Sequence, residues 1–312
     1  MSDDELDDAD LRAKLGVFAH TAPLREQPPR ESAIRPPRRR WVFAAVGATL
    51  AAAAVIAYLV RQKPQPCAGD GLAFEIAGGT ATCRGHAVAR GALAPGAWLE
   101  TDTQATATVA LANVGTVTIG AGSRVRVVES KTDKQRIELA RGSLTAEVNA
   151  PPRLFVVDTP VTTAVDLGCA YAITVAQDGG THLRVTRGAV NLEDKRGTIY
   201  VPATFEIDML PGRLGTPVSV DATPDMRALI TRLDRGEDTL GDIVAMASFH
   251  ERVTLWNLIN RTHDRRAIDK LVELAPLPDA SLRAKVDAGN ADAMDIWLDV
   301  FVDRGNLAHK PR

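Results

Sequence analysis

Alternating apolar and polar residues dominate the middle of the chain, from about residue 67 to residue 220. The segments TATVALANVGTVTIGAGSRVRVVES (106–130) and RLFVVDTPVTTAVDLGCAYAITVAQDGGTHLRVTRGAVNLED (153–194) show this pattern over most of their length. Valine, threonine and isoleucine are typical of strands, and glycine interrupts the runs at intervals of about 8–12 residues. The region is therefore predicted to form many short antiparallel strands, as a sandwich, a barrel or a solenoid of stacked hairpins.

One sequence motif occurs twice in this region. RIELARGSLTAEV (136–148) and HLRVTRGAVNLE (182–193) both consist of an alternating run, an Arg-Gly pair and a second alternating run. Glycine accepts a positive φ and close backbone approach where a strand ends or bulges, so Gly142 and Gly188 are predicted to be structural turns, as is Gly115. In this interpretation Arg141 and Arg187 are incidental.

The spacing of apolar residues changes after residue 221. Five segments carry apolar residues at intervals of three and four, and several begin near Asp or Thr and end near Gly. They predict about five short helices, with residues 239–262 read as one helical segment and Trp256 and Trp297 as core anchors. The five segments are residues 224–238, 239–262, 264–274, 278–289 and 291–305.

The longest apolar run is WVFAAVGATLAAAAVIAYLV, residues 41–60, which contains no charged residue. A helix of about 20 apolar residues crosses a hydrocarbon core of about 30 Å, and a signal-peptide core of about 7–15 residues would be shorter. We therefore expect one transmembrane helix here. Positive residues concentrate before the run rather than after it, so the N-terminus is expected in the cytoplasm and the C-terminus outside it. The preceding arginines are Arg30, Arg35, Arg38, Arg39 and Arg40, and Arg61 and Lys63 follow.

The first 40 residues combine an acidic start with a basic, proline-rich end. Leu11, Leu15 and Phe18 lie at helical spacing on one face, which makes them a candidate partner-binding helix. A helix this short is marginal alone, so the alternative is a largely disordered tail. The remainder, with its prolines and arginines, is predicted to be an extended spacer.

Three cysteines follow the apolar run. Cys67 and Cys83 lie close in sequence on the side predicted to be exported, where an oxidising compartment would favour a disulfide between them. Closing a loop of about 15 residues would stabilise the fold by about 3 kcal/mol in the chain-entropy model. Cys169 lies within an apolar run and is predicted to be a buried small hydrophobic residue.

Composition argues against several classes of function. The net charge of the 312-residue chain is −2 and aromatic residues make up 4%, which disfavours nucleic-acid binding. The six histidines are scattered without metal-ligand spacing, and no nucleophile elbow or phosphate loop is present. We therefore predict no enzyme, no catalytic residue, no cofactor and no metal site.

Four segments of the β region, taken in order, resemble the FecR domain of ferric-citrate-regulator-type membrane proteins. Each is rich in Gly, Thr and Val, and their order over about 100 residues behind one N-in transmembrane helix carries the resemblance. The segments are GAWLETDTQATATVALANVGTVTIGAGSRVRV (96–127), IELARGSLTAEV (137–148), FVVDTPVTTAVDLGCAYAITV (155–175) and LRVTRGAVNLE (183–193).

The resemblance implies a single-pass protein of the bacterial inner membrane. In the family, an exported β domain receives an envelope signal, and a cytoplasmic N-terminal segment controls an extracytoplasmic-function sigma factor. The cytoplasmic part here is only about 40 residues, and the exported end is helical, so a second hypothesis stays open: a membrane-anchored module that binds or scaffolds a periplasmic protein or glycan.

Together these patterns predict six regions. A largely disordered cytoplasmic tail is followed by the transmembrane helix, a linker with the disulfide-closed β segment, the FecR-like β domain, the helical region and a short tail. Their ranges are residues 1–40, 41–60, 61–95, 96–220, 221–305 and 306–312.

Overall fold

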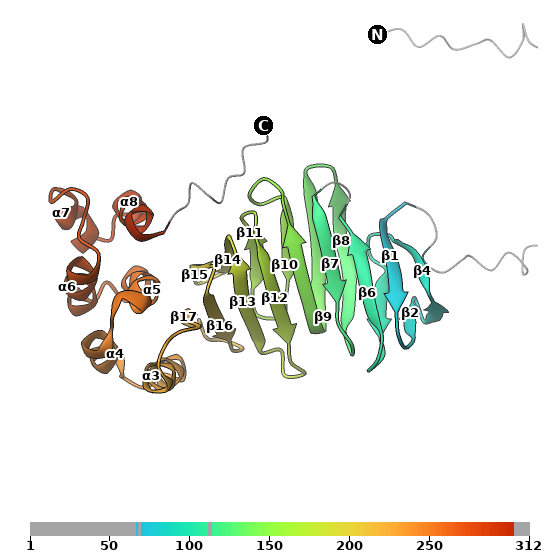
Figure 1. Ribbon diagram of the computed structural model, residues 1–312, viewed down its shortest axis with the longest axis horizontal. Coiled ribbons are helices and arrows are strands. Elements are labelled where there is room, and N and C mark those ends of the chain that lie inside the picture. Colours follow the sequence, from blue (N-terminus) through green and yellow to red (C-terminus); the bar gives the residue numbers. More distant parts are fainter. Residues whose placement is uncertain (1–66, 68–69, 112–113, 303–312) are drawn as a thin grey trace, which may run out of the picture. The chain divides into compact units, whose positions relative to one another are not determined.

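A computed structural model describes residues 67, 70–111 and 114–302, all of which belong to one compact unit, Pro64–Arg312. Within it, strands run from residue 72 to residue 219 and helices follow, which confirms the predicted order of a β-rich region and a helical region (Figure 1). The strands are β1 (Leu72–Ala77), β2 (Ala81–Cys83), β3 (His86–Val88), β4 (Arg90–Leu93), β5 (Trp98–Thr101), β6 (Thr106–Ala110), β7 (Gly115–Ile119), β8 (Arg124–Lys131), β9 (Lys134–Val148), β10 (Phe155–Asp158), β11 (Thr163–Asp166), β12 (Ala170–Val175), β13 (Thr181–Arg187), β14 (Ala189–Asp194), β15 (Gly197–Pro202), β16 (Phe205–Met209) and β17 (Val218–Ser219).

The strands form two sheets that share one strand. Sheet 1 has the order β4-β1-β6-β7-β9-β12-β13-β16-β17. Sheet 2 has the order β3-β2-β5-β8-β9-β10-β11-β14-β15, and its β9–β10 pair is parallel whereas the other pairs are antiparallel. Hairpins of the two sheets alternate along the chain, so the fold is a stack of hairpins whose apolar faces meet.

Strand β9 belongs to both sheets. Its first half pairs with β8 and β10 in sheet 2, and from Gly142 onward it pairs with β7 and β12 in sheet 1. The buried positions shift from odd to even residue numbers across this point, from Ile137 and Leu139 to Leu144 and Ala146. That shift of phase turns the apolar side of both halves toward one core.

Gly142 lies at the point where β9 passes from sheet to sheet. Its φ is 90°, and a Cβ atom there would overlap the Cα atom and hydroxyl of Ser123. The buried Ser123 hydroxyl donates to the Ser143 carbonyl at 3.1 Å and accepts from the Ser143 amide at 2.9 Å. The Ser123 side chain thus takes the place of a strand partner, and its close approach requires glycine.

The second Arg-Gly pair also marks a passage between sheets. Strand β13 belongs to sheet 1 and β14 to sheet 2, and Gly188 between them has a φ of 72°. A Cβ atom on Gly188 would overlap the carbonyl oxygen of Gly168, which lies in the neighbouring corner between β11 and β12. The two echoing segments are therefore equivalent corners of the stack.

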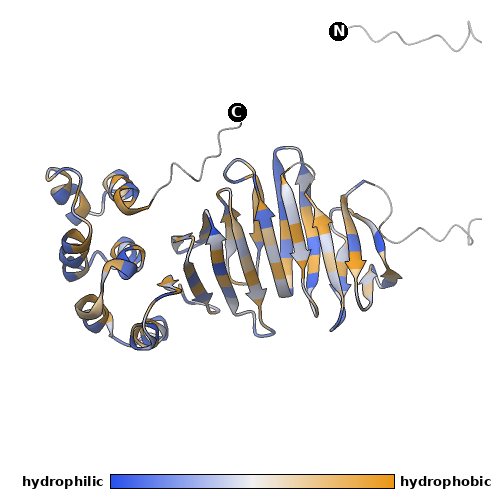
Figure 2. Cartoon of the chain, in the orientation of Figure 1, coloured by the Kyte–Doolittle hydropathy of each residue, from blue (hydrophilic) through white to orange (hydrophobic). Residues whose placement is uncertain are grey.

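Side chains from both sheets fill one hydrophobic core. Phe155, Tyr171, Leu144 and Ile173 are among its largest fully buried members. Figure 2 shows the alternation of hydrophobic and hydrophilic residues along the strands that produces this core. Burial of such side chains stabilises a fold by about 1.5–3 kcal/mol each, so the core is the main source of stability in the β region.

The helical region contains more breaks than the sequence predicted. Residues 239–262, read as one segment, form α4 and α5 separated by a 3-10 turn, η2. The break begins at Ala247, whose ψ is 133°, and Ser248 and Glu251 then form a capping box that starts a new helix. The helices are α3 (Pro224–Asp234), α4 (Leu240–Met246), η2 (Phe249–Glu251), α5 (Arg252–Thr262), α6 (Arg265–Leu274), α7 (Leu282–Asp287) and α8 (Ala291–Phe301).

The helices share a core anchored by two tryptophans, as predicted. Trp297 is fully buried and its indole donates to the Ala275 carbonyl at 2.8 Å, while Trp256 donates to the Met294 carbonyl at 2.9 Å. The Trp256 ring also meets the Tyr200 ring of β15 edge-on at 6.3 Å. The helical core is therefore continuous with the last strand of sheet 2.

Helix α5 covers the open edge of sheet 2. The side-chain amide of buried Asn257 accepts from the Tyr200 amide at 3.1 Å and donates to the Tyr200 carbonyl at 3.0 Å. These are the two hydrogen bonds that a further strand would make with Tyr200 of β15. An edge covered by a helix is protected from pairing with another chain, so the helices end the stack at β15.

Several predictions fall outside the described residues, including the tails at residues 1–40 and 306–312. The expected transmembrane helix at residues 41–60 and the candidate helix carrying Leu11, Leu15 and Phe18 both lie there. Among the helices that the structure describes, none has the length and apolar character needed to cross a membrane.

We predict that Gly142→Ala destabilises the chain far more than Gly122→Ala. Both glycines have positive φ, 90° and 66°, but nothing lies within 4 Å of a Cβ atom placed on Gly122. Backbone strain alone should cost about 1–2 kcal/mol at Gly122. The overlap with Ser123 should add about 2 kcal/mol at Gly142. Urea unfolding of both variants measures the difference, and equal losses would show that the close approach does not matter.

A second prediction concerns the covered edge of sheet 2. Asn257→Ala leaves the buried amide and carbonyl of Tyr200 without their α5 partner, so the free energy of unfolding should fall by about 2–4 kcal/mol. The control is Asn260→Ala, one turn later on α5, where the exposed side chain donates only to the Trp256 carbonyl. That change should stay within about 0.5 kcal/mol. Similar unfolding midpoints for the two variants would contradict the edge-covering role.

Candidate functional site

A pocket of about 590 Å³ lies where the ends of the last strands meet the helices. Its walls come from the β13–β14 corner, β15, the β15–β16 corner, η2, the first turn of α5 and the end of α8. We call it the junction pocket. The side chains that define it are Arg187, Tyr200, Phe205, Asp221, Phe249, His250, Arg252, Val253, Phe301 and Val302.

The break between α4 and α5 positions one wall of the pocket. Glu251 is buried, and its carboxylate accepts from the Ser248 amide at 2.9 Å and from the Ser248 hydroxyl at 2.7 Å. This capping box directs the two residues between them outward, so that Phe249 remains 60% exposed although it is a large apolar side chain. An exposed phenylalanine in a pocket wall is typical of a binding surface rather than of a core.

Arg252 packs beside this phenylalanine. Its guanidinium carbon lies 3.2 Å from the Phe249 ring centroid and 5.5 Å from that of Phe301, and its Nε donates to the Phe249 carbonyl at 2.8 Å. Burial lowers the pKa of Arg252. No carboxylate in the part of the chain described by the structure forms a salt bridge with it, so aromatic faces provide its main electrostatic partner.

A second arginine enters the pocket from the β13–β14 corner. Arg187 is exposed and belongs to the second Arg-Gly pair. The sequence interpretation treated both arginines of these pairs as incidental, and the structure differs. Arg141 forms a salt bridge with Glu100 at 3.0 Å, and Arg187 lines the pocket.

A buried carboxyl-thiol pair supports the adjacent β11–β12 corner. Asp166 accepts hydrogen bonds from the amides of Gly168 and Cys169, at 2.6 and 3.2 Å, and from the Cys169 thiol at 2.8 Å. Burial raises the pKa of Asp166 to about 6, against the opposing effect of these hydrogen bonds and of Arg187. Burial and the neighbouring Asp166 also raise the pKa of the Cys169 thiol, so this buried cysteine stays protonated and is not activated as a nucleophile.

A second pocket, of about 370 Å³, lies between β13, β16 and α3, and most of its charged side chains already have partners. His182 contacts Asp208 at 2.8 Å, and Asp234 accepts from the Thr216 hydroxyl at 2.6 Å. Arg227 and Glu206 form a further salt bridge. In the junction pocket neither arginine forms a direct salt bridge with a described residue, so it is the better candidate for binding a ligand.

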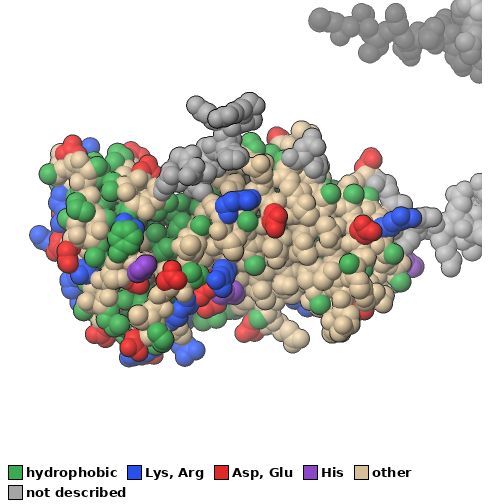
Figure 3. Space-filling model, viewed as in Figure 1, with side chains coloured by type: hydrophobic (Ala, Val, Ile, Leu, Met, Phe, Trp, Pro, Cys, Tyr) green, Lys and Arg blue, Asp and Glu red, His purple; other side chains and the backbone are tan. Residues whose placement is uncertain are grey.

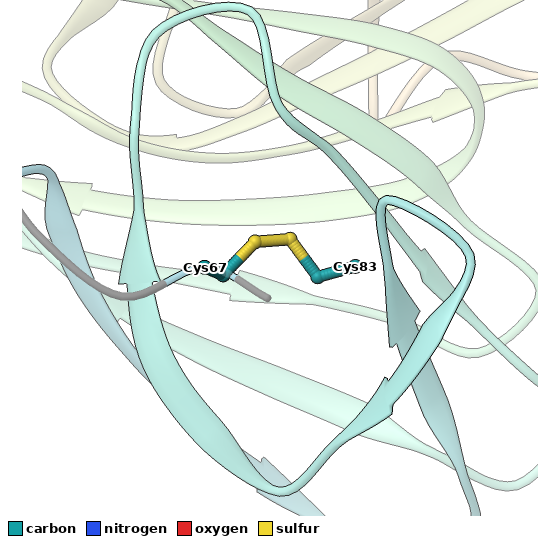
Figure 4. The surroundings of a disulfide bond; sticks show 2 residues. All are labelled: Cys67 and Cys83. Atoms are coloured by element: carbon teal, nitrogen blue, oxygen red, sulfur yellow. A yellow bond between two sulfur atoms is a disulfide. The ribbon is translucent and has the colours of Figure 1, made fainter. Parts of the chain in front are cut away.

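The other predicted site residues lie away from the junction pocket. Cys67, which precedes β1, and Cys83, the last residue of β2, form a disulfide with 6.2 Å between their Cα atoms (Figure 4). Gly115 starts β7 with a φ of 150°, beside the backbone at the end of β9. Of the predicted turns, only Gly188 lines the junction pocket.

Sequence reasoning predicted none of the pocket side chains, and Phe249 and Arg252 are the two that matter most for the site. Both lie in the segment that was read as a continuous helix, and the signal that would have separated them was Ser248 followed by Glu251, the spacing of a capping box. Figure 3 shows hydrophobic and charged side chains gathered over the helices, whereas uncharged polar side chains and backbone dominate the strands on that face. Across the described residues, no cluster of three or more His, Cys, Asp or Glu could hold a metal ion.

We predict that Asp166→Asn removes a pH-dependent contribution to stability. The folded pKa of about 6 lies above the unfolded value of about 3.9. The folded state therefore binds the proton more tightly, and stability from this group is fully present below pH 4 and lost as the pH rises through 6. Between pH 4 and pH 7 the wild-type chain should lose about 2–3 kcal/mol relative to D166N. Urea unfolding at both pH values measures this change, and a constant difference would contradict the raised pKa.

Comparison with known proteins finds a family match for part of the β region. The model described as FecR protein matches residues 97–191, which run from before β5 into β14. Two solved structures of a candidate anti-sigma factor from Parabacteroides distasonis, at 1.65 and 2.50 Å resolution, are similar at 17% identity and a TM-score of 0.35. Each match covers 43% of this chain and 64% of that chain, less than two thirds of its length. No curated protein matches the chain. The two-sheet stack of hairpins at residues 97–191 is therefore a FecR domain.

Proposed function

We propose that this chain is a single-pass inner-membrane regulator that transmits an envelope signal to a cytoplasmic sigma factor. The observation that carries the proposal is the FecR domain at residues 97–191, encoded behind the uncharged run of residues 41–60. In this arrangement the FecR domain and helices lie in the periplasm, and residues 1–40 lie in the cytoplasm. The sigma factor would be of the extracytoplasmic-function class.

Two features support the proposed placement of the parts. Arginines concentrate before the apolar run, as expected for a cytoplasmic N-terminus. The disulfide between Cys67 and Cys83 suits an oxidising compartment beyond that run. Together they favour a periplasmic location for the folded unit.

The junction pocket supplies a place where a signal could act. It joins the last corners of the β stack to the helices, and its charged and aromatic groups face an open volume. A ligand bound there would contact both parts of the folded unit. Nothing in this proposal requires chemistry on the ligand, so the chain acts as a receptor rather than as an enzyme.

A second candidate function is a membrane-anchored binding or scaffolding module. The observation that favours it is the helical region, which lies outside residues 97–191 and contributes α5 and α8 to the junction pocket. In that case the N-terminal tail would serve only as part of the anchor. The two functions differ in what they require of residues 1–40.

We predict that Leu11, Leu15 and Phe18 bind the sigma factor. A two-hybrid assay pairs residues 1–40 with each extracytoplasmic-function sigma factor of the same genome. Replacing the three apolar residues by Ala should weaken the productive pair at least tenfold, because apolar anchors at an interface contribute more than about 1 kcal/mol each. The control variant, Arg12→Ala with Lys14→Ala, changes neighbouring polar positions and should bind normally.

The same variants distinguish the two candidate functions in the cell. If the regulator hypothesis is correct, replacing all three apolar residues in the full chain alters transcription from the promoters of that sigma factor. The control variant does not. If residues 1–40 bind no sigma factor and an unrelated anchor restores normal function, the scaffolding module replaces the regulator.

A further inference from the structure

The junction pocket is lined by two arginines, and the guanidinium of one of them, Arg252, lies beside aromatic rings. Arg187 comes from the corner between β13 and β14, and Arg252 from the first turn of α5. Neither forms a salt bridge within residues 67, 70–111 and 114–302. Most arginines of the β stack differ, since Arg126 and Arg136, for example, are paired with carboxylates. Both guanidinium groups are therefore free of direct salt bridges to described residues, although Arg187 interacts electrostatically with Asp166 and Asp221 lines the same pocket.

The positive charge of Arg252 is partly shielded from water. Its guanidinium lies over the Phe249 ring and near the Phe301 ring, and burial lowers its pKa with no opposing contribution from a carboxylate. A partly buried cation is stabilised most by an anion that can accept several of its hydrogen bonds. Among the described residues, Arg252 donates through its Nε group alone, to the Phe249 carbonyl. Its terminal nitrogens remain available to an anion.

The remaining lining restricts the charge and shape of that anion. Asp221 lies in the same wall and would repel a doubly charged group, so a monoanion is favoured over a phosphate monoester. Phe205, Val253 and Phe301 provide an apolar surface beyond the arginines. The volume of about 590 Å³ falls within the range of about 300–1,000 Å³ that is typical of small-molecule sites.

We propose that the junction pocket binds a free amphiphilic carboxylate. Its carboxylate group contacts Arg187 and Arg252, and its hydrocarbon body packs against Phe249 and Phe301. Describing this molecule as the envelope signal rests on the proposed function, whereas its binding does not. A binding measurement on the purified chain therefore tests the site even if the sigma-factor hypothesis fails.

The test compares three ligands that share one hydrocarbon body. Isothermal titration calorimetry of the full-length chain in detergent measures binding of decanoate, decanol and decylamine. We expect saturable binding of one decanoate, at least tenfold weaker binding of decanol and no binding of decylamine. Equal binding of decanoate and decylamine would overturn the proposal, and so would the absence of decanoate binding. Binding only to vesicles of phosphatidylglycerol, with none to free decanoate, would also overturn it.

Variants then locate the binding site. Arg187→Gln and Arg252→Gln should each weaken decanoate binding about tenfold, equivalent to about 1.4 kcal/mol, whereas Arg252→Lys should retain part of the affinity. Arg184→Gln is the matched control, because it removes an exposed arginine of the same strand outside the pocket. Arg187 is exposed, so Arg187→Gln should keep the wild-type unfolding midpoint. Unchanged affinity in both Gln variants, or an equal loss in Arg184→Gln, would contradict the site.

Discussion

The passage of β9 from one sheet to the other is the constraint on which the β region depends. Because one strand supplies pairing edges to β8 and β10 in one sheet and to β7 and β12 in the other, both sheets share a fixed register. The passage requires a glycine, since the Ser123 hydroxyl approaches the backbone closely enough to hydrogen-bond to both the amide and the carbonyl of Ser143. Hairpins on either side of β9 can then face each other across one core.

A stack of hairpins leaves its last strand with an unpaired edge. Here helix α5 covers that edge at β15. Asn257 satisfies the backbone of Tyr200 as a strand would, and Trp256 packs against the Tyr200 ring. This arrangement also creates the junction pocket, because strand corners and helix ends leave a space that neither fills. The proposed receptor site is thus a consequence of the way in which the stack ends.

Local patterns in the sequence predicted the strands, the later helices and the glycine turns of the two Arg-Gly pairs, because each of these depends on neighbouring residues. In β9 the change of phase between Leu139 and Leu144 was visible in the sequence, although its meaning depended on knowing that two sheets meet there. The pairing order of the sheets depends on contacts between distant segments, which one sequence does not specify.

The junction pocket could not be predicted from the sequence for the same reason. Arg187 and Arg252 come from segments 65 residues apart in the chain, and only the packing of α5 against β15 brings them to one pocket. Local signals suggested a solvated arginine at a turn and a continuous helix. The capping box at Ser248 was the one local clue to the break that exposes Phe249.

The central claim is that a periplasmic signal reaches a cytoplasmic regulator through this chain, and its topology is the most direct test. A reporter enzyme that is active only outside the cytoplasm is fused after Arg312, and a cytoplasm-only reporter is fused at the same position as the control. The account predicts activity of the first fusion alone. Activity of only the cytoplasmic reporter would contradict the account, because the FecR domain and the junction pocket would then face no envelope signal.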